Sequence, residues 1–550
     1  MMSQKNSQSN KNINTTNIYF LIGVWLLSCI ISVIILPPVA DDYFYFVRGL
    51  GFANYGNIGV LVGEEYLLSF LNVPGHSIMQ GTFLFLWDLI GLPINYFTYR
   101  IFHILLILLL LLATLYLFTK MNPHTPQLNK FTGSLFLALI ALTPFTQYCW
   151  ALHPVILGIL LIVLGLLPLA GKDTLEKVSS PRYFCSAFFI GCAATVHANI
   201  SLRAGILVVA VMVISAIRKR WKRSLLYGFT ASIPLVLSLI WFLAFMPESL
   251  DEFFTNIGTK KVSFSLETIP VYVLLQNAFF SGPWNSVFIR GFYTILWLPL
   301  LLCMIATCYQ LLKHRENLLQ RSDTFVLLTI LFIIELIRLF IPEGDKSLVY
   351  FTMTSFFTLI LLLPLFFNNS TEDKSPLSSF PIISKGIILF IMTSSILFHP
   401  AVHSVKFLFS STNYFSPIRM SQAVRNHLNQ DDTFFVSAKQ ALPVFSDLIA
   451  ARYANKENIE IYSVFPAFRH PAKNKINIQN LERKLRNVIP SKSVWGFAKH
   501  NFQCSGGKAN VTFTTHTDDS VQVNFQGLRV IYEDKDFIFI RPETLNYTIE

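Results

Sequence analysis

Two adjacent carboxylates, Asp41 and Asp42, closely follow the first long apolar segment of the chain, residues 18–36. A polar boundary after a membrane helix, or the N-cap of a following helix, needs only one such residue. Two carboxylates side by side disfavour each other's ionisation, so one of them is suited to take a proton from a hydroxyl group. We therefore predict that Asp41 is a general base supported by Asp42, with a divalent metal site as the alternative.

The residues that follow, 44–71, alternate aromatic and apolar side chains with Arg48, Glu64 and Glu65. This segment is too polar to cross a bilayer and too apolar for a free loop, a composition typical of amphipathic helices on a membrane surface. We predict a pair of such helices within an interfacial outer loop over residues 37–76. Its three charged residues are further candidates for the site.

Other ionisable residues flank or interrupt the later apolar segments. His76 follows the interfacial loop and is expected near Asp41. His153 lies in a predicted outward turn, where a structural role is the simpler interpretation. Glu335 and Arg338 are three residues apart in an apolar segment, so they share a helix face. Charged residues inside a membrane are expensive unless paired or functional, and we expect these two to form an ion pair.

The composition indicates a membrane protein. Only 13% of the 550 residues are charged and 53% are hydrophobic, whereas soluble globular proteins carry about 25% charged residues. This excludes a disordered, collagen-like or disulfide-stapled chain and a single large soluble enzyme. The net charge of +12 does not indicate nucleic-acid binding. Its densest basic run, residues 218–223, lies directly between two apolar segments, as in cytoplasmic loops of membrane proteins.

Crossing a bilayer takes about 20 apolar residues, and the charge runs give the direction of each crossing. Because the first span runs outward and residues 202–217 run inward, an even number of crossings must lie between them, yet five candidate spans lie there. We therefore predict about 11–12 spans, with 77–92 re-entrant or interfacial; the alternative is the proline-broken region 131–170. The candidates are 18–36, 77–92, 101–118, 131–144, 154–170, 183–199, 202–217, 224–246, 290–312, 323–341, 348–367 and 381–399.

The domain organisation follows from these segments. Residues 1–17 form a polar cytoplasmic leader, residues 18–399 the membrane domain, and residues 400–550 have ordinary soluble composition. The tail is predicted to be a small, outward-facing α+β domain, because alternating apolar and polar residues predict short strands. Its expected elements are helices near 419–429 and 478–488 and strands at 511–515, 520–525 and 536–541.

The arrangement as a whole resembles a known superfamily. A first span followed by Asp41-Asp42-Tyr43, an interfacial outer loop, about a dozen spans and an outward C-terminal domain are similar to the GT-C membrane glycosyltransferases. Within them the chain resembles the bacterial Gtr-type O-antigen glucosyltransferases. The resemblance implies a polyprenyl-phosphate-linked sugar as donor and a cell-surface glycan (O-antigen or lipopolysaccharide) or lipid-linked acceptor. It places the reaction on the outer face of the bacterial inner membrane, with the C-terminal domain in the periplasm.

The same resemblance implies roles for individual residues. Asp41 and Asp42 are the catalytic pair, and a bound Mg²⁺ or Mn²⁺ would lie on them. Basic residues at outward ends of spans hold the carrier phosphate, and aromatic side chains such as Tyr43 stack on sugar rings. The candidates for the phosphate are Lys346, Arg338 and Arg290.

Two other functions fit a polytopic chain that handles lipid-linked sugars. A transporter or flippase is expected to show inverted repeats, and the sequence shows no repeat. An O-antigen polymerase or ligase is expected to carry its catalytic outer loop late in the chain, whereas the acidic pair here follows the first span. A simple membrane anchor for the tail would not need a dozen spans.

Overall fold

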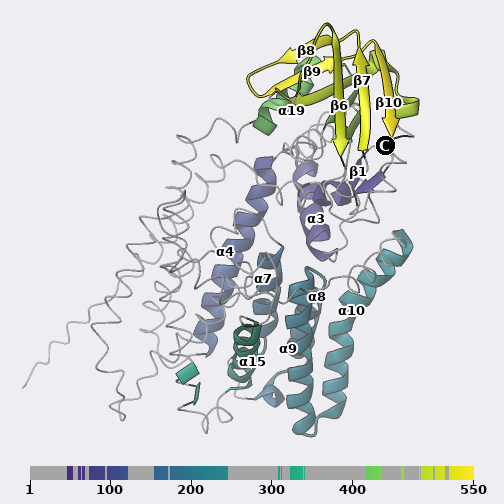
Figure 1. The fold of residues 1–550 in the computed structure, drawn as a ribbon. Coiled ribbons are helices and arrows are strands. Elements are labelled where there is room, and N and C mark those ends of the chain that lie inside the picture. Colours follow the sequence, from purple (N-terminus) through teal and green to yellow (C-terminus); the bar gives the residue numbers. More distant parts are fainter. Residues whose placement is uncertain are drawn as a thin grey trace, which may run out of the picture.

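The structure, a computed structural model, describes a bundle of helices and, above it in Figure 1, a β-rich C-terminal domain. The residues that it describes are 46, 48–53, 60–62, 65–67, 74–92, 94, 96–121, 154–170, 174–245, 308–309, 311–312, 322–338, 340, 416–429, 432–436, 460–463, 482, 485–499, 502–514 and 520–549. The predicted spans at 18–36, 131–144, 348–367 and 381–399, and most of that at 290–312, lie outside these residues.

The remaining predicted apolar segments are helices. Ile200–Ile217 and Trp221–Trp241 are each long and apolar enough to cross a membrane, judged over the described part of the chain. The helices are α3 (Gly75–Leu89), α4 (Tyr96–Met121), α7 (Val155–Leu166), α8 (Ser180–Ala194), α9 (Ala198–Ile217), α10 (Trp221–Phe245) and α15 (Asp323–Arg338).

Helices α8, α9 and α10 pack closely because a small residue lies where two of them cross. A Cβ atom on Gly191 of α8 would lie 2.2 Å from the backbone oxygen of Ala231 on α10. Only glycine permits that approach, as at other close helix contacts in membranes. About two turns earlier on α8, the Tyr183 hydroxyl is 2.8 Å from Ser215 Oγ, so buried hydroxyl groups pair between helices.

The two ends of this bundle are named here by the turns that close them. The turn between α8 and α9 contains His197, and the turn between α9 and α10 contains Arg218. We call them the His197 end and the Arg218 end. Helix α15 runs antiparallel to α9, because its first residue contacts Arg218 and its later residue Glu335 contacts Arg203 near the start of α9.

The interfacial segment is only partly helical. Residues 48–53 are helical, but Val60–Val62 (β1) pairs antiparallel with Glu65–Leu67 (β2), so that Val62 lies opposite Glu65. The prediction of two amphipathic helices is therefore wrong for this second half.

Helix α3 is short. Its 15 residues give a length of about 22 Å at 1.5 Å per residue, whereas the hydrocarbon core is about 30 Å thick, so α3 does not cross it alone. It begins where the N–H of Gly75 donates to the backbone oxygen of Thr195, 2.8 Å away. Figure 1 shows α3 on the side of the α8–α9 turn that faces the β-rich domain.

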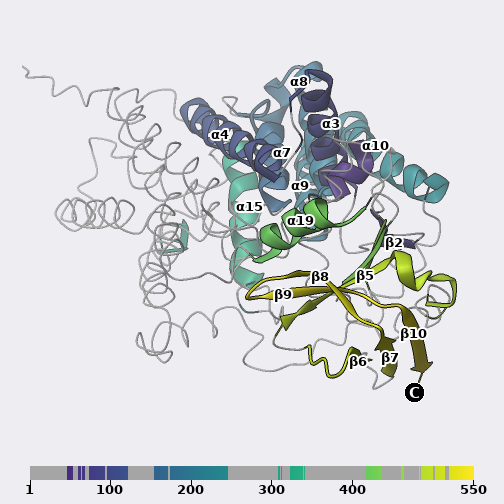
Figure 2. The same cartoon turned by 90° about the horizontal axis from the view of Figure 1, so that it is seen from above.

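The C-terminal domain contains two sheets and helix α19 (Ser416–His427). One sheet has the order β4-β3-β5-β9-β8, in which β3 is parallel to β4 and β5; the other has the antiparallel order β10-β7-β6. Figure 2 shows both from above. The strands are β3 (Thr433–Val436), β4 (Glu460–Ser463), β5 (Ser493–Ala498), β6 (Lys508–Thr514), β7 (Ser520–Gln526), β8 (Arg529–Glu533), β9 (Phe537–Arg541) and β10 (Thr544–Ile549).

This domain has an aromatic core. Trp495 is fully buried, and its ring stacks on that of Phe435 with the centroids 4.3 Å apart. The predicted helix at 419–429 and the three predicted strands correspond to α19, β6, β7 and β9. The remaining strands were not predicted, because short runs such as Thr433–Val436 are too short for their periodicity to be distinguished from that of a loop.

Candidate active site

Buried ionisable side chains gather at the His197 end. His76 in the first turn of α3 and His103 on α4 have ring centroids 5.5 Å apart, and His76 lies edge-on to Phe102 at 6.3 Å. Arg48, from the helical segment 48–53, is also buried, as is His197 in the α8–α9 turn. Four parts of the chain that are far apart in sequence therefore bring their polar groups together.

The surroundings keep His76 neutral. Burial lowers the pKa of His76 well below its ordinary value of 6.5, and the charges of His103, Arg48 and His197 lower that pKa further. Desolvation and nearby positive charge both disfavour the protonated imidazole. A neutral imidazole has one donor and one acceptor nitrogen, so His76 can serve polar ligands at neutral pH without adding charge.

The segment that carries Arg48 is held against α3 by glycines. A Cβ atom on Gly81 of α3 would lie 2.6 Å from the backbone oxygen of Gly49, and one on Gly49 would lie 2.7 Å from Cδ of Gln80. The two backbones therefore approach closely only because both positions lack a side chain. This contact sets the place of a segment that begins a few residues after Asp42.

A buried ion pair lies nearby between α9 and α15. Arg203 Nη2 donates to Glu335 Oε2 at 2.7 Å, Arg203 Nε contacts Glu335 Oε1, and both side chains are 0% exposed. Both carboxylate oxygens of Glu335 are thus contacted from a neighbouring helix, a partner that the sequence did not indicate, and the expected pairing of Glu335 with Arg338 stays a prediction. Arg338 is buried one helical turn beyond Glu335.

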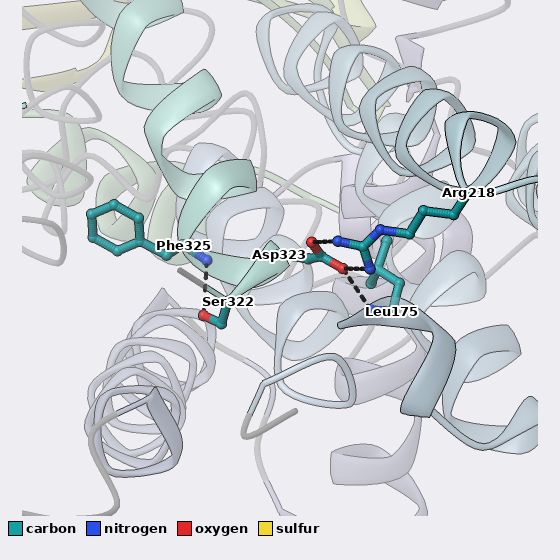
Figure 3. A network of polar contacts seen from close by, with 5 residues as sticks. All are labelled: Leu175, Arg218, Ser322, Asp323 and Phe325. Atoms are coloured by element: carbon teal, nitrogen blue, oxygen red, sulfur yellow. Dashed lines mark hydrogen bonds and ion pairs between the residues drawn. The ribbon is translucent and has the colours of Figure 1, made fainter. Parts of the chain in front are cut away.

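The Arg218 end has a matching polar contact, shown in Figure 3. Arg218 donates through both terminal nitrogens to Asp323, at 2.6 and 2.5 Å, and the same carboxylate accepts the backbone N–H of Leu175 at 2.6 Å. Arg223 donates to the backbone oxygen of Val178 at 3.0 Å. The basic run 218–223, which predicted a cytoplasmic loop, thus also forms an ion pair and hydrogen bonds within the protein. Its charge pattern alone did not indicate these contacts.

The predicted site residues divide into two sets. Of those described, Arg48 and His76 lie together, Arg338 is buried at the same end of the bundle, and Glu65 lies on β2. Sequence reasoning missed Gln80, Arg100 and His103, although the last two interrupt an apolar run at a spacing of three residues. The predicted residues that lie outside the description are Asp41, Asp42, Tyr43, Glu64, His153, Arg290 and Lys346.

A metal centre finds no support within the described part of the chain, which contains no group of three or more His, Cys, Asp or Glu side chains placed to hold an ion. The buried groups at the His197 end are mostly guanidinium and imidazole, which suit an anion better than a cation. The predicted metal ligands, Asp41 and Asp42, are not among these residues, so the metal stays a prediction.

Comparison with known proteins identifies the fold. No family model matches the sequence, and no curated protein matches it. The crystal structure of ArnT from Cupriavidus metallidurans in the apo state superposes with a TM-score of 0.54 at 11% identity, covering 96% of this chain and 98% of ArnT. This chain has the ArnT fold. ArnT bound to undecaprenyl phosphate gives a TM-score of 0.53 at 12% identity, with the same coverage.

The fold confirms part of the sequence-based expectation. The chain therefore has the polytopic helical membrane fold, with a β-rich C-terminal domain, that its composition and apolar segments predicted, and its membership of the GT-C superfamily stays a prediction. The archaeal oligosaccharyltransferase AglB from Archaeoglobus fulgidus, in complex with an inhibitory peptide and a dolichol-phosphate, covers 88% of this chain and 70% of its own at 12% identity. Its TM-score of 0.48 is too low to add to the assignment. The narrower Gtr-type resemblance stays a prediction.

Proposed function

We propose that the protein is a membrane glycosyltransferase that moves a sugar from a polyprenyl-phosphate donor to a cell-surface glycan or lipid-linked acceptor, in O-antigen or lipopolysaccharide modification. The fold supports this proposal, since it is shared with ArnT, which has been crystallised with undecaprenyl phosphate. In this proposal the protein lies in the bacterial inner membrane, with residues 1–17 in the cytoplasm and the C-terminal domain in the periplasm.

The observation that carries the proposal is the group of buried arginines at the His197 end. One of them, Arg203, binds the buried carboxylate of Glu335. A departing polyprenyl phosphate is an anion tethered at the membrane surface, and preorganised cations away from water stabilise such a leaving group strongly. These arginines are Arg48, Arg100, Arg203 and Arg338.

The proposed reaction is a single displacement. A hydroxyl oxygen of the acceptor attacks the anomeric carbon of the donor while the bond from that carbon to the phosphate oxygen breaks, which inverts the anomeric centre. Asp41, supported by Asp42, takes the proton of the attacking hydroxyl. The lipid phosphate leaves with the bonding electron pair, and Arg338, Lys346 and Arg290 are proposed to balance its charge.

A divalent ion is the second part of the proposal. Asp41 and Asp42 offer the hard oxygen ligands that Mg²⁺ and Mn²⁺ prefer, and a bound ion would orient the acceptor and donor. Loss of transfer in EDTA, with recovery on addition of Mg²⁺ or Mn²⁺, is the expected result. Full transfer in EDTA would exclude a requirement for a metal ion, and the carboxylates would then act alone.

The test of the function compares cells with and without the gene. Deletion should remove one sugar from the surface glycan and cause the corresponding polyprenyl-phosphate sugar to accumulate, both measured by mass spectrometry. Re-expression should restore the glycan. Unchanged glycans together with unchanged lipid-linked sugars would contradict the proposal.

A further inference from the structure

Helix α3 turns His76, Ser77 and Gln80 inward and several large apolar residues outward, the reverse of a helix on a soluble protein. The buried residues on α3 are His76, Ser77, Gln80, Gly81 and Leu84. The large apolar residues exposed on it are Met79, Phe85, Leu86 and Leu89. In a membrane protein, a helix with this inverted pattern lines a polar interior and contacts lipid with its other side.

On the inner side of α3, the side-chain amide of Gln80 lacks hydrogen-bond partners among the described residues. The Gln80 side chain is 0% exposed, and neither Oε1 nor Nε2 has a hydrogen-bond partner in the part of the chain that the structure describes. The backbone of Gly49 holds it closely, since a Cβ atom there would lie 2.7 Å from Gln80 Cδ. Most buried side-chain polar atoms have a partner, and an unsatisfied one requires a specific explanation.

The donor and the acceptor of the Gln80 amide indicate which chemical group could bind it. A carboxamide presents a donor and an acceptor side by side, and a hydroxyl group both donates and accepts, so the two can satisfy each other. A phosphate accepts only, and would leave Oε1 without a donor. His76 lies one helical turn earlier on the same face, and Arg48, whose charge acts on His76, precedes Gly49, the residue packed against Gln80. A cation suited to a phosphate, Arg48, therefore lies near an amide suited to hydroxyl groups.

We propose that Gln80 is a specificity-determining residue that binds a hydroxyl group of the donor sugar. This inference rests on the proposed function, since it takes the donor to be a sugar on a polyprenyl phosphate. A site built to bond a hydroxyl strongly rejects an analogue that lacks it, because its buried polar atoms are then left unpaired. Gln80 thus selects among sugars, whereas the neighbouring cations serve the phosphate that all such donors share.

The test measures binding to the purified full-length protein in detergent. The probes are undecaprenyl phosphate and its glucose, galactose and N-acetylglucosamine conjugates, together with analogues of the tightest conjugate that each lack one ring hydroxyl. Gln80→Met keeps the size of the side chain and removes both polar atoms. Thr82→Val is the matched control, because Thr82 is exposed on the same helix and its hydroxyl only bonds the backbone oxygen of Ile78.

The parental protein should bind one conjugate about tenfold or more tightly than bare undecaprenyl phosphate, and one deoxy analogue should lose that gain. Gln80→Met should lose the same gain, bind that analogue as tightly as the conjugate, and keep its affinity for undecaprenyl phosphate. Thr82→Val should behave as the parent.

Two results would overturn the inference alone. If Gln80→Met keeps the parental preference for the conjugate, the amide does not contact the sugar. If it loses affinity for bare undecaprenyl phosphate to the same extent, Gln80 supports the site as a whole instead of selecting a sugar. A parental protein that prefers no conjugate would contradict the proposed function itself, and this inference with it.

Discussion

At the scale of single residues, buried charge is balanced across helices. Sequence reasoning recognised Glu335 as an expensive residue in an apolar segment but missed its partner Arg203. Helix periodicity relates residues of one helix, whereas Arg203 lies on another helix, 132 positions away. The Arg218–Asp323 contact could not be predicted for the same reason, since a charge run indicates a side of the membrane but no contact within the protein.

Removing Arg203 should destabilise the fold. Breaking a fully buried ion pair by removing one partner costs about 3–5 kcal/mol, because the other charge is left uncompensated. We expect Arg203→Met to lower the thermal unfolding temperature in detergent strongly, and Arg203→Met combined with Glu335→Met to recover part of the loss. A double variant that is less stable than Arg203→Met alone would show that the pair is not the main contact of Glu335.

The variant Arg338→Met distinguishes a structural role of Arg338 from a catalytic one. Since Arg203 binds the carboxylate of Glu335, loss of Arg338 does not leave that carboxylate unpaired. We expect normal protein levels and a lower rate of sugar transfer, measured with purified protein. A reduced protein level with unchanged specific activity would assign Arg338 to the fold and leave Lys346 as the candidate for the phosphate.

His76 should make stability depend on pH. Its pKa is lowered on folding, so below about 6.5 the unfolded chain binds a proton that the folded chain does not. The stabilisation is fully present above that pH and declines as the pH falls. Thermal unfolding measured from pH 8 to pH 5 should show this decline, and His76→Gln should reduce it. An equal decline in His76→Gln would exclude this residue as the cause.

At the scale of elements, helices were predicted more accurately than the segments between them. Long apolar segments such as 202–217 and 224–246 correspond closely to α9 and α10, because a run of that length has few alternatives in a membrane. The interfacial segment was harder. Its apolar residues fit an amphipathic helix or a hairpin equally, and the structure has a helical piece at 48–53 followed by β1 and β2.

Two glycines test the importance of close helix packing. A Cβ atom on Gly191 would lie 2.2 Å from the Ala231 oxygen, whereas one on Gly205 would have nothing within 4 Å. Gly191→Ala should therefore destabilise by about 1–3 kcal/mol through overpacking. Gly205→Ala, the matched control, should be neutral or slightly stabilising, because alanine favours helix. Equal thermal unfolding of the two variants would contradict the close contact between α8 and α10.

At the scale of the whole molecule, composition was enough to predict a polytopic membrane protein, and the order of its parts was enough to suggest the GT-C fold. The site was only partly predictable. Arg48 and His76 were singled out because they lie in the interfacial loop and at its end. Gln80 was missed, because a glutamine at the start of an apolar helix indicates nothing until its burial is known.

The orientation of the molecule can be tested with cysteine labelling. Cys504 is exposed in the C-terminal domain, so an impermeant thiol reagent should label it in intact spheroplasts. In a Cys504→Ser background, Lys222→Cys should be protected until the membrane is opened, because the basic turn is expected on the cytoplasmic side. Labelling of Lys222→Cys from outside would invert the orientation and place the His197 end in the cytoplasm.

The central claim is that the carboxylates after the first span catalyse sugar transfer. The most direct measurement is the rate of transfer by purified Asp41→Asn, with Asp88→Asn, an exposed acid on α3, as control. A general base contributes about 10²–10⁴-fold to rate. We predict a loss of that size for Asp41→Asn, a smaller loss for Asp42→Asn, and the parental rate for Asp88→Asn. Transfer at the parental rate by both Asp41→Asn and Asp42→Asn would reduce the pair to a membrane boundary and contradict the catalytic assignment.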